Sequence, residues 1–286
     1  WREGGYEGAT QVTKELLRYW RREDRPLPLF FCQLEAAETI IFLNEIRLSG
    51  KYVRFKPAFE DKFLPRLEDQ ARDPALPSLT RLGCKMATGS GKTVVMAMLI
   101  AWSFCNRGKV SSDVRFPAAA LVVCPNLTIK ERLQVLRPEN ADSYYTEFDL
   151  VPARMRPLLQ TGKVFITNWH LFLPESEHVE GGESYQVVDK GPESPDAFAR
   201  RVLGDLYDRA PIMAFNDEGH HAWRPNFPDE QDKVQKGELE TATVWVEGLD
   251  KINQAVGIRF GMDLSATPFY IQGSGYVEGS PFPWVV

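Results

Sequence analysis

Residues 86–93 read Met-Ala-Thr-Gly-Ser-Gly-Lys-Thr, and this stretch decides the fold. It joins a strand candidate at 81–86 to a helix candidate at 92–107, which is the context that a phosphate-binding loop requires. The glycines let backbone N–H groups turn towards phosphate oxygens, and the helix N-terminus adds partial positive charge. We therefore predict that Lys92 contacts the β- and γ-phosphates of ATP and that the Thr93 hydroxyl ligates Mg²⁺. The predicted nucleotide contacts are Thr88, Gly89, Ser90, Gly91, Lys92 and Thr93.

Strand and helix patterns alternate from residue 81 to the end of the chain. Alternation of this kind predicts an α/β domain with a mainly parallel sheet and helices on both faces. Residues 118–123 are apolar at every position, as expected of a strand that is covered on both faces. The other strands are expected at 163–167, 211–216 and 258–264, and helices at 128–135 and around Trp245, Leu249, Ile252 and Val256, which have helical spacing.

The first 80 residues have a different pattern. Thr10 is expected to cap a helix in which Val12, Leu16 and Tyr19 recur at the spacing i, i+4, i+7. A second helix is expected after Phe31, with Ala36, Ile40 and Leu43 on one stripe and Gly50 at its end, and residues 51–80 are expected to be irregular. We therefore expect an N-terminal helical segment over residues 1–80 and a nucleotide-binding domain over residues 81–286.

Composition narrows the class of protein. No apolar run reaches the roughly 18 residues that a membrane helix needs, so no membrane contact is expected. The net charge of −5 counts against strong duplex binding through bulk charge, although binding along one groove stays open. The cysteines form no CxxC pair and are expected to be buried free thiols in a reducing, cytoplasmic setting. These cysteines are Cys32, Cys84, Cys105 and Cys124.

Two acid-rich, proline-bearing stretches, residues 174–197 and 224–240, are interpreted as solvated surface loops. The second contains residues 228–233, Pro-Asp-Glu-Gln-Asp-Lys, which have the letters of a restriction-nuclease core but not its spacing. We interpret that segment as part of the loop and expect no nuclease site in it.

A pair of acids, Asp217 and Glu218, follows the apolar strand at 211–216. Ligands of open α/β sheets bind at the carboxyl ends of the strands, so Asp217 is expected to hold Mg²⁺ and Glu218 to position the attacking water. His220 and His221 stand directly behind these acids. A zinc site at the two histidines is not expected, because neighbours on an extended segment point apart and no other Cys or His is near in sequence.

The string Ser265-Ala266-Thr267-Pro268 follows the last strand and completes a recognisable order of signals. The phosphate loop, then Asp-Glu-Gly-His, then Ser-Ala-Thr resembles motifs I, II and III of superfamily 2 helicases of the DExH type. The wording around motifs II and III resembles the helicase subunit of type III restriction enzymes, and the resemblance spans residues 30–270.

This resemblance assigns roles to further residues. Gln33 is implied to read adenine, and His220 to couple the catalytic site to Ser265 and Thr267 of motif III. Trp169 has two readings, a stacking platform for a base or a buried aromatic. The implied nucleic-acid contacts are Pro125, Asn126, Thr128, Lys130, Arg132, Thr167 and Asn168.

The resemblance implies a RecA-like P-loop NTPase domain, the first motor domain of an ATP-dependent helicase or translocase. Its implied cofactors are ATP and Mg²⁺, and its implied partners are nucleic acid (DNA favoured over RNA), a second RecA-like domain in the full-length chain and a modification subunit. A nucleotide-binding scaffold without turnover and another P-loop enzyme, such as a kinase or an AAA-type ATPase, stay open as alternatives. Intact Lys92, Thr93, Asp217 and Glu218 argue against the scaffold, and the Ser-Ala-Thr string with His220 favours the helicase class.

Overall fold

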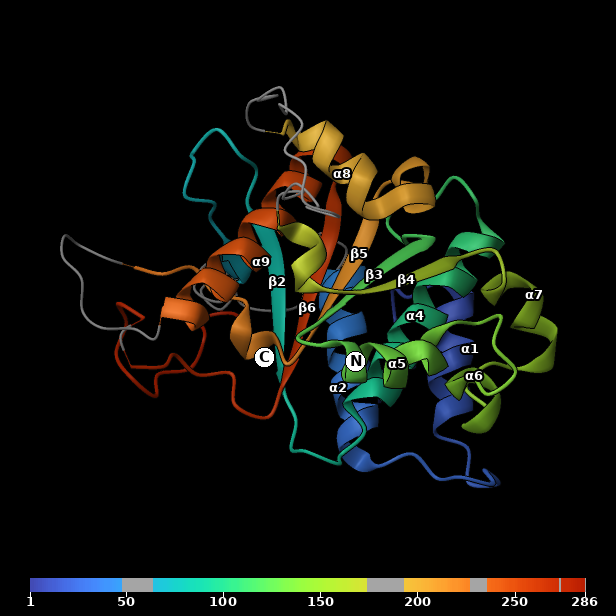
Figure 1. Ribbon diagram of the computed structural model, residues 1–286. Helices are drawn as coiled ribbons and strands as arrows, with labels where there is room; N and C mark the ends of the chain where they lie inside the picture. The colour runs from blue at the N-terminus through green and yellow to red at the C-terminus, as the bar shows by residue number, and fades with distance from the viewer. Residues whose placement is uncertain (48–63, 174–192, 227–235, 273, 286) are drawn as a thin grey trace.

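A twisted, mainly parallel sheet forms the centre of the chain (Figure 1). The computed structural model describes residues 1–47, 64–173, 193–226, 236–272 and 274–285. In this part of the chain the strand order is β1-β2-β6-β5-β3-β4, and only the β1–β2 pair is antiparallel. This confirms the predicted α/β class with a mainly parallel sheet. The strands are β1 (Glu68–Asp69), β2 (Leu79–Lys85), β3 (Ala119–Cys124), β4 (Lys163–Asn168), β5 (Ile212–Asp217) and β6 (Ile258–Ser265).

The register of the sheet brings the predicted motifs to one edge. Lys85 pairs with Ser265, Asp217 pairs with Leu264, and Cys124 pairs with Asn168. All five parallel strands therefore end at the same level, and the segments that follow them gather there. This carboxyl edge is where open α/β sheets bind ligands.

Helices cover both faces of the sheet (Figure 1). On one face α4 (Lys92–Lys109) packs between the sheet and the N-terminal helices α1 (Gln11–Trp20) and α2 (Phe31–Ile41). Every residue of α4 from Val94 to Asn106 is buried, because sheet and helices surround it. The opposite face is covered by α8 (Pro195–Leu203) and α9 (Lys236–Val256), which pack on each other.

Shorter helices connect these elements. On the α4 face lie α5 (Leu127–Arg132), α6 (Tyr144–Glu147) and α7 (Arg156–Leu159). The 3-10 segments are Leu64–Leu67, Leu133–Leu136, Ala153–Met155, Trp169–Phe172, Gly204–Arg209 and Gly219–His221, and a π-helical turn, Phe42–Arg47, extends α2. No helix in the described ranges combines the length and the hydrophobicity that crossing a membrane would need.

The N-terminal helices are tied to α4 by a buried polar contact. Trp102 of α4 donates from Nε1 to Glu45 Oε2 at 3.0 Å and to Thr13 Oγ1 at 3.1 Å. Thr10 caps α1 as predicted, accepting from the Thr13 N–H at 3.1 Å, and its own N–H donates to Glu45. The helices that precede the phosphate loop therefore share one core with the helix that follows it.

Several predicted boundaries are wrong. Residues 51–80 were expected to be irregular, yet β1 and the start of β2 fall within 64–80 because Glu68 and Asp69 pair with the strand that leads to the phosphate loop. The loops expected at 174–197 and 224–240 are also shorter than predicted, because α8 begins at Pro195 and α9 at Lys236. Residues 48–63, with Gly50, as well as 174–192 and 227–235, with the nuclease-like string, lie outside the described residues.

Burial differs from expectation at two positions. On α2, Ile40 and Leu43 of the expected stripe are buried, whereas Ala36 is half-buried and its neighbour Ala37 is buried. Cys32 is exposed at the start of α2, whereas the other three cysteines are buried free thiols. Burial raises the pKa of Cys84 and Cys124 to about 11 and that of Cys105 to about 12, so these thiols stay protonated at neutral pH.

Candidate active site

The loop from Met86 to Gly91 leaves β2 and turns into α4. Gly91 is the N-cap residue and has φ of +86°, a conformation that side chains with a Cβ rarely adopt. A Cβ at this position would also collide with Nε2 of Gln33. Residues 87–89 are exposed, and the loop stands before the N-terminus of an 18-residue helix. These features fit a phosphate group, which backbone N–H groups and the helix dipole would bind.

Lys92 connects the phosphate loop to the motif II acids. Its Nζ lies 3.3 Å from Oε1 of Glu218, although the two residues belong to different strand–loop units. Glu218 has a positive φ of +52°, an uncommon conformation for a residue with a side chain. Strained backbone of this kind gathers at functional sites, and here it turns the Glu218 carboxylate towards the phosphate loop.

Asp217 ends β5 with its side chain largely buried. Burial, and then the charge of Glu218, raises the pKa of Asp217 to about 6, while Lys92 and Arg132 oppose this shift. A carboxylate that is short of positive charge in a buried position suits a divalent cation. Thr93 lies in the first turn of α4, and hydroxyl and carboxylate oxygens are ligands that Mg²⁺ takes together with phosphate oxygens. The donor set therefore fits Mg²⁺.

His220 joins motif II to motif III. Its Nδ1 lies 2.8 Å from Oγ of Ser265 and 3.4 Å from Oε2 of Glu218. The Ser265 hydroxyl also accepts a hydrogen bond from the N–H of Thr267 at 3.0 Å. Burial, followed by the neighbouring His221, lowers the pKa of His220 to about 4, so the ring is neutral at neutral pH. The side chains of His220, Glu218 and Ser265, with the Thr267 N–H, thus connect the turn after β5 to the end of β6.

Gln33 lies beside the phosphate loop, and its side-chain amide hydrogen-bonds to backbone groups of the protein. Its Oε1 accepts from the Phe30 N–H at 2.9 Å, and its Nε2 donates to the Ser90 carbonyl at 3.1 Å. The Gln33 side chain is buried and thereby links α2 to the phosphate loop. The Ser90 hydroxyl also serves the loop, since it donates to the Ala87 carbonyl at 2.6 Å.

The candidate nucleic-acid contacts divide into accessible and inaccessible residues. Asn126 is exposed and caps α5, accepting from the Ile129 N–H at 3.0 Å, and Thr128 and Arg132 are exposed on that helix. Thr167 is buried in the sheet, and its hydroxyl donates to the Asn168 carbonyl at 3.2 Å. Its side chain is therefore turned away from any strand that crosses this edge. Pro125, Lys130 and Asn168 are half-buried.

His220 and His221 do not lie on an extended segment as expected. Residues 219–221 form a 3-10 turn rather than an extended segment, and the rings of His220 and His221 lie side by side with centroids 4.1 Å apart. Within the described residues no group of three or more His, Cys, Asp or Glu side chains is arranged to hold a metal ion. The turn places His220 towards motif III and brings His221 beside it.

Sequence reasoning missed a buried network beneath the site. Asp263 of β6 accepts hydrogen bonds from Arg81 Nε at 3.0 Å, Asn216 Nδ2 at 2.7 Å and Trp284 Nε1 at 2.7 Å. Asn216 directly precedes Asp217, and Asp263 stands two residues before Ser265. The network therefore fixes the strands that carry motifs II and III relative to each other. Only the polarity of Asn216 and Asp263 within two apolar strands signals it in the sequence.

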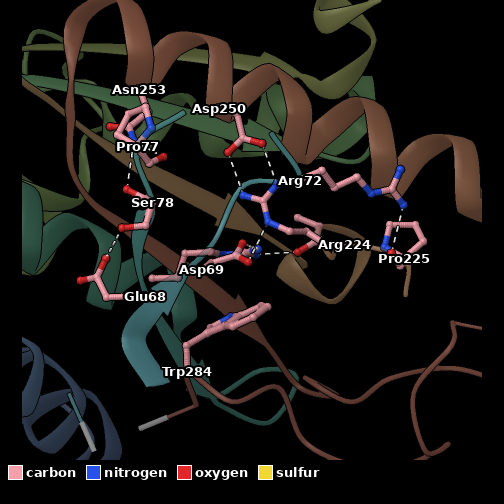
Figure 2. Close-up of polar contacts among 12 residues, drawn as sticks. Glu68, Asp69, Arg72, Pro77, Ser78, Arg224, Pro225, Asp250, Asn253 and Trp284 are labelled. Atoms are coloured by element: carbon pink, nitrogen blue, oxygen red, sulfur yellow. Dashed lines mark hydrogen bonds and ion pairs between the residues drawn. The ribbon is translucent and has the colours of Figure 1, made fainter. Parts of the chain in front are cut away.

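The network continues to the edge strand β1 and to helix α9 (Figure 2). Arg81 also donates to Asp69 of β1 at 2.9 Å, and Arg224 bridges Asp69 at 2.8 Å and Asp250 of α9 at 2.6 and 2.7 Å. These carboxylates pair with the guanidinium groups of both arginines, which are largely shielded from solvent. The segment that follows motif II is thereby anchored to β1 and α9.

Comparison with known families agrees with this geometry. The family described as "Type III restriction enzyme, res subunit" matches residues 32–270, which include the phosphate loop, the motif II acids and Ser265. A search of curated proteins found no match.

Proposed function

Because the chain belongs to the family of type III restriction enzyme res subunits, whose matching region is a helicase-like ATP-binding motor domain, we propose that it is the first motor domain of an ATP-driven translocase or helicase on nucleic acid, with DNA as the track. The observation that carries this proposal is the convergence of three loops at one edge of the sheet. Lys92 meets Glu218, and His220 meets both Glu218 and Ser265. A P-loop kinase has no need for the last of these contacts.

The proposed chemistry assigns one task to each group. Backbone N–H groups of the phosphate loop and Lys92 bind the β- and γ-phosphates, and Gln33 holds the loop through the Ser90 carbonyl. Asp217 and Thr93 hold Mg²⁺, which neutralises charge on the phosphoryl oxygens when it is bound. Glu218 orients the water for in-line attack. His220 couples the catalytic site to Ser265 and Thr267 of motif III.

The wider assembly follows from the same proposal. A second RecA-like domain of the full-length protein supplies arginines to the transition state, a contribution of about 10³–10⁵ in rate in P-loop NTPases. This chain alone is therefore expected to bind ATP·Mg²⁺ and to hydrolyse it slowly. We also propose residues 1–80 as an N-terminal helical segment, residues 81–286 as the RecA-like domain, and a modification subunit as a partner.

The track is proposed to cross the loops after β3 and β4. Exposed groups at the start of α5, with the charges of Lys130 and Arg132 and the Asn168 amide, offer donors to phosphates. Contacts of this kind carry no sequence information, which suits a motor that steps along any sequence. Thr167 is left out of this proposal because its side chain is buried.

Two variants in the full-length protein test the function. Lys92→Ala should weaken binding of a fluorescent ATP analogue, because the charge that meets the phosphates is lost. Glu218→Gln should keep that binding and abolish steady-state ATP hydrolysis, because the amide has the same size but no charge to orient water. If Glu218→Gln loses ATP affinity as severely as Lys92→Ala, the role of Glu218 is wrong.

Measuring ATP hydrolysis with and without nucleic acid separates the motor from another P-loop enzyme and from a nucleotide-binding scaffold. ATP hydrolysis by the full-length protein should rise with single- or double-stranded DNA and rise less with RNA. Turnover that ignores every nucleic acid would indicate another P-loop enzyme. Binding of ATP without turnover under any of these conditions would indicate a nucleotide-binding scaffold.

A further inference from the structure

A hollow of about 200 Å³ opens at the carboxyl edge of the sheet, and none of the catalytic groups lines it. Its walls come from four elements: Pro125 follows β3, Trp169 follows β4, His221 belongs to the turn after β5, and Glu238 and Thr241 lie in the first turns of α9. Trp169 packs against the core on the α9 face, whereas the phosphate loop leads into α4 on the other face. The hollow is thus separate from the proposed nucleotide site.

The lining has the chemistry of a site for one flat, partly polar ring. Trp169, His221 and Pro125 contribute rings to the lining, and Glu238 adds a carboxylate that accepts hydrogen bonds from N–H groups. Trp169 also stacks on His170, with ring centroids 4.0 Å apart and planes inclined by 27°, which holds the indole in place. Pockets for whole small-molecule ligands usually have about 300–1,000 Å³, so this hollow suits a single ring system.

Its position identifies the source of such a ring. Pro125 directly precedes the exposed start of α5, and Trp169 directly follows Asn168, so the hollow lies between the two loops proposed to hold phosphates. A phosphate in the hollow itself is disfavoured by the Glu238 carboxylate. A base has a π-face for the rings and N–H groups for the carboxylate.

We propose that this hollow receives one unstacked base of the nucleic-acid strand that crosses the loops after β3 and β4. The proposal depends on the proposed function, because it requires a strand on that edge. Aromatic stacking tolerates every base, so the pocket would grip a strand without reading its sequence.

The pocket is connected to Glu218 through the rings of two histidines. The ring of His221 lies 4.1 Å from that of His220, which in turn is within hydrogen-bonding distance of Ser265 and 3.4 Å from Glu218. A base that packs on His221 restricts the His220 ring and hence the groups around Glu218. Occupancy of the hollow should therefore stimulate ATP hydrolysis, which gives the strand a direct path to the ATP site.

The test uses the full-length protein and oligothymidine in which one central residue is either intact or abasic. The readout is the ratio of the two dissociation constants, in which electrostatic effects of a substitution cancel. Loss of one stacked base should weaken binding of the unaltered protein by about five- to a hundredfold. Trp169→Ala should bring this ratio close to one, and Trp169→Phe, which keeps a flat ring, should restore most of it.

Two further variants keep the test decisive if Trp169→Ala is poorly folded. Glu238 is exposed, so Glu238→Ala should leave the fold intact and lower the ratio by removing the acceptor for the base. Tyr207→Ala is the matched control, because Tyr207 is an aromatic on the same face of the sheet but outside the hollow, and the ratio should not change. Binding of a fluorescent ATP analogue reports the folded state of each variant.

The possible results separate the two proposals. If the unaltered protein binds the intact oligonucleotide and the ratio is already near one, or stays high in Trp169→Ala that still binds ATP, the base pocket is refuted and the motor function stands. If no oligonucleotide binds and none stimulates hydrolysis, the proposed function fails and the pocket fails with it. A quench of 2-aminopurine placed at the central position, lost in Trp169→Ala, would support the pocket.

Discussion

Arg224 offers the sharpest test of what stabilises the domain beneath its catalytic edge (Figure 2). Its guanidinium donates two hydrogen bonds to Asp250 at 2.6 and 2.7 Å and one to Asp69 at 2.8 Å, and the three side chains are only 11%, 4% and 7% exposed. In Arg224→Met, Asp69 keeps its contact with Arg81, whereas Asp250 loses both hydrogen bonds from Arg224. Removing one partner of a buried pair leaves an uncompensated charge and costs about 3–5 kcal/mol.

This cost should be visible as a change in unfolding temperature. At roughly 2–4 °C per kcal/mol for a domain of this size, Arg224→Met should lower the melting temperature by about 6–20 °C. Urea denaturation followed by tryptophan fluorescence gives the free energy of unfolding, and thermal melting followed by circular dichroism checks it. Combining Arg224→Met with Asp250→Leu should recover much of the loss, because the stranded carboxylate is removed.

The matched control is an exposed pair of the same chemistry. Arg200 and Asp196 lie on α8 at 3.0 Å, with side chains 60% and 58% exposed. Arg200→Met should cost less than about 1 kcal/mol, because water screens such pairs. The reasoning is refuted if Arg224→Met costs no more than Arg200→Met, or if the double substitution is as unstable as the sum of the two single ones.

Three further outcomes are expected. Replacing Lys130 and Arg132 together with Ala should lower the slope of log affinity against log salt by up to about two, equally for two unrelated oligonucleotides, and an unchanged slope would place the track elsewhere. Ser265→Ala removes the partner of His220 at 2.8 Å, so DNA-stimulated turnover should fall while ATP affinity is kept; equal losses of both in steady-state kinetics and titration would contradict the coupling role. Leu99→Ala empties a fully buried position in α4 and should cost about 2–5 kcal/mol in urea unfolding, whereas a loss under 1 kcal/mol would mean that the helix is not enclosed as described.

Local patterns made the sheet and the phosphate loop predictable. The uninterrupted apolar run of β3 and the Gly-Lys-Thr signal before α4 each depend on neighbours in sequence, and both elements appear within two residues of the expected bounds. The end of β5 was found for the same reason, so Asp217 was expected at the carboxyl edge and lies there.

The contacts that join these pieces were not predictable, because they depend on tertiary packing. Gln33 was assigned to adenine by resemblance, and nothing in its sequence neighbourhood indicated that its amide also donates to the Ser90 carbonyl, 57 residues away. Thr167 looks like a phosphate ligand in sequence, but the close of β4 turns it into the sheet. The helix α8 was missed because its start lies in an acid-rich, proline-bearing stretch with the composition of a loop. His221 was separated from His220 on the assumption of an extended backbone, and a tight turn places the two rings together.

The packing of α1 has a consequence for synthesis of the chain on the ribosome. The indole of Trp20 is almost fully buried and donates to the carbonyl of Leu150, 130 residues later, at 2.8 Å. At about 5–20 residues per second, α1 emerges roughly 6–26 s before the segment that completes its environment. During that interval the face formed by Leu16, Leu17 and Trp20 is still without much of the surface that will cover it. The nascent chain therefore exposes the apolar face of an amphipathic helix before the motor core exists, and heterologous expression should benefit from slower elongation or from added chaperones that bind such helices.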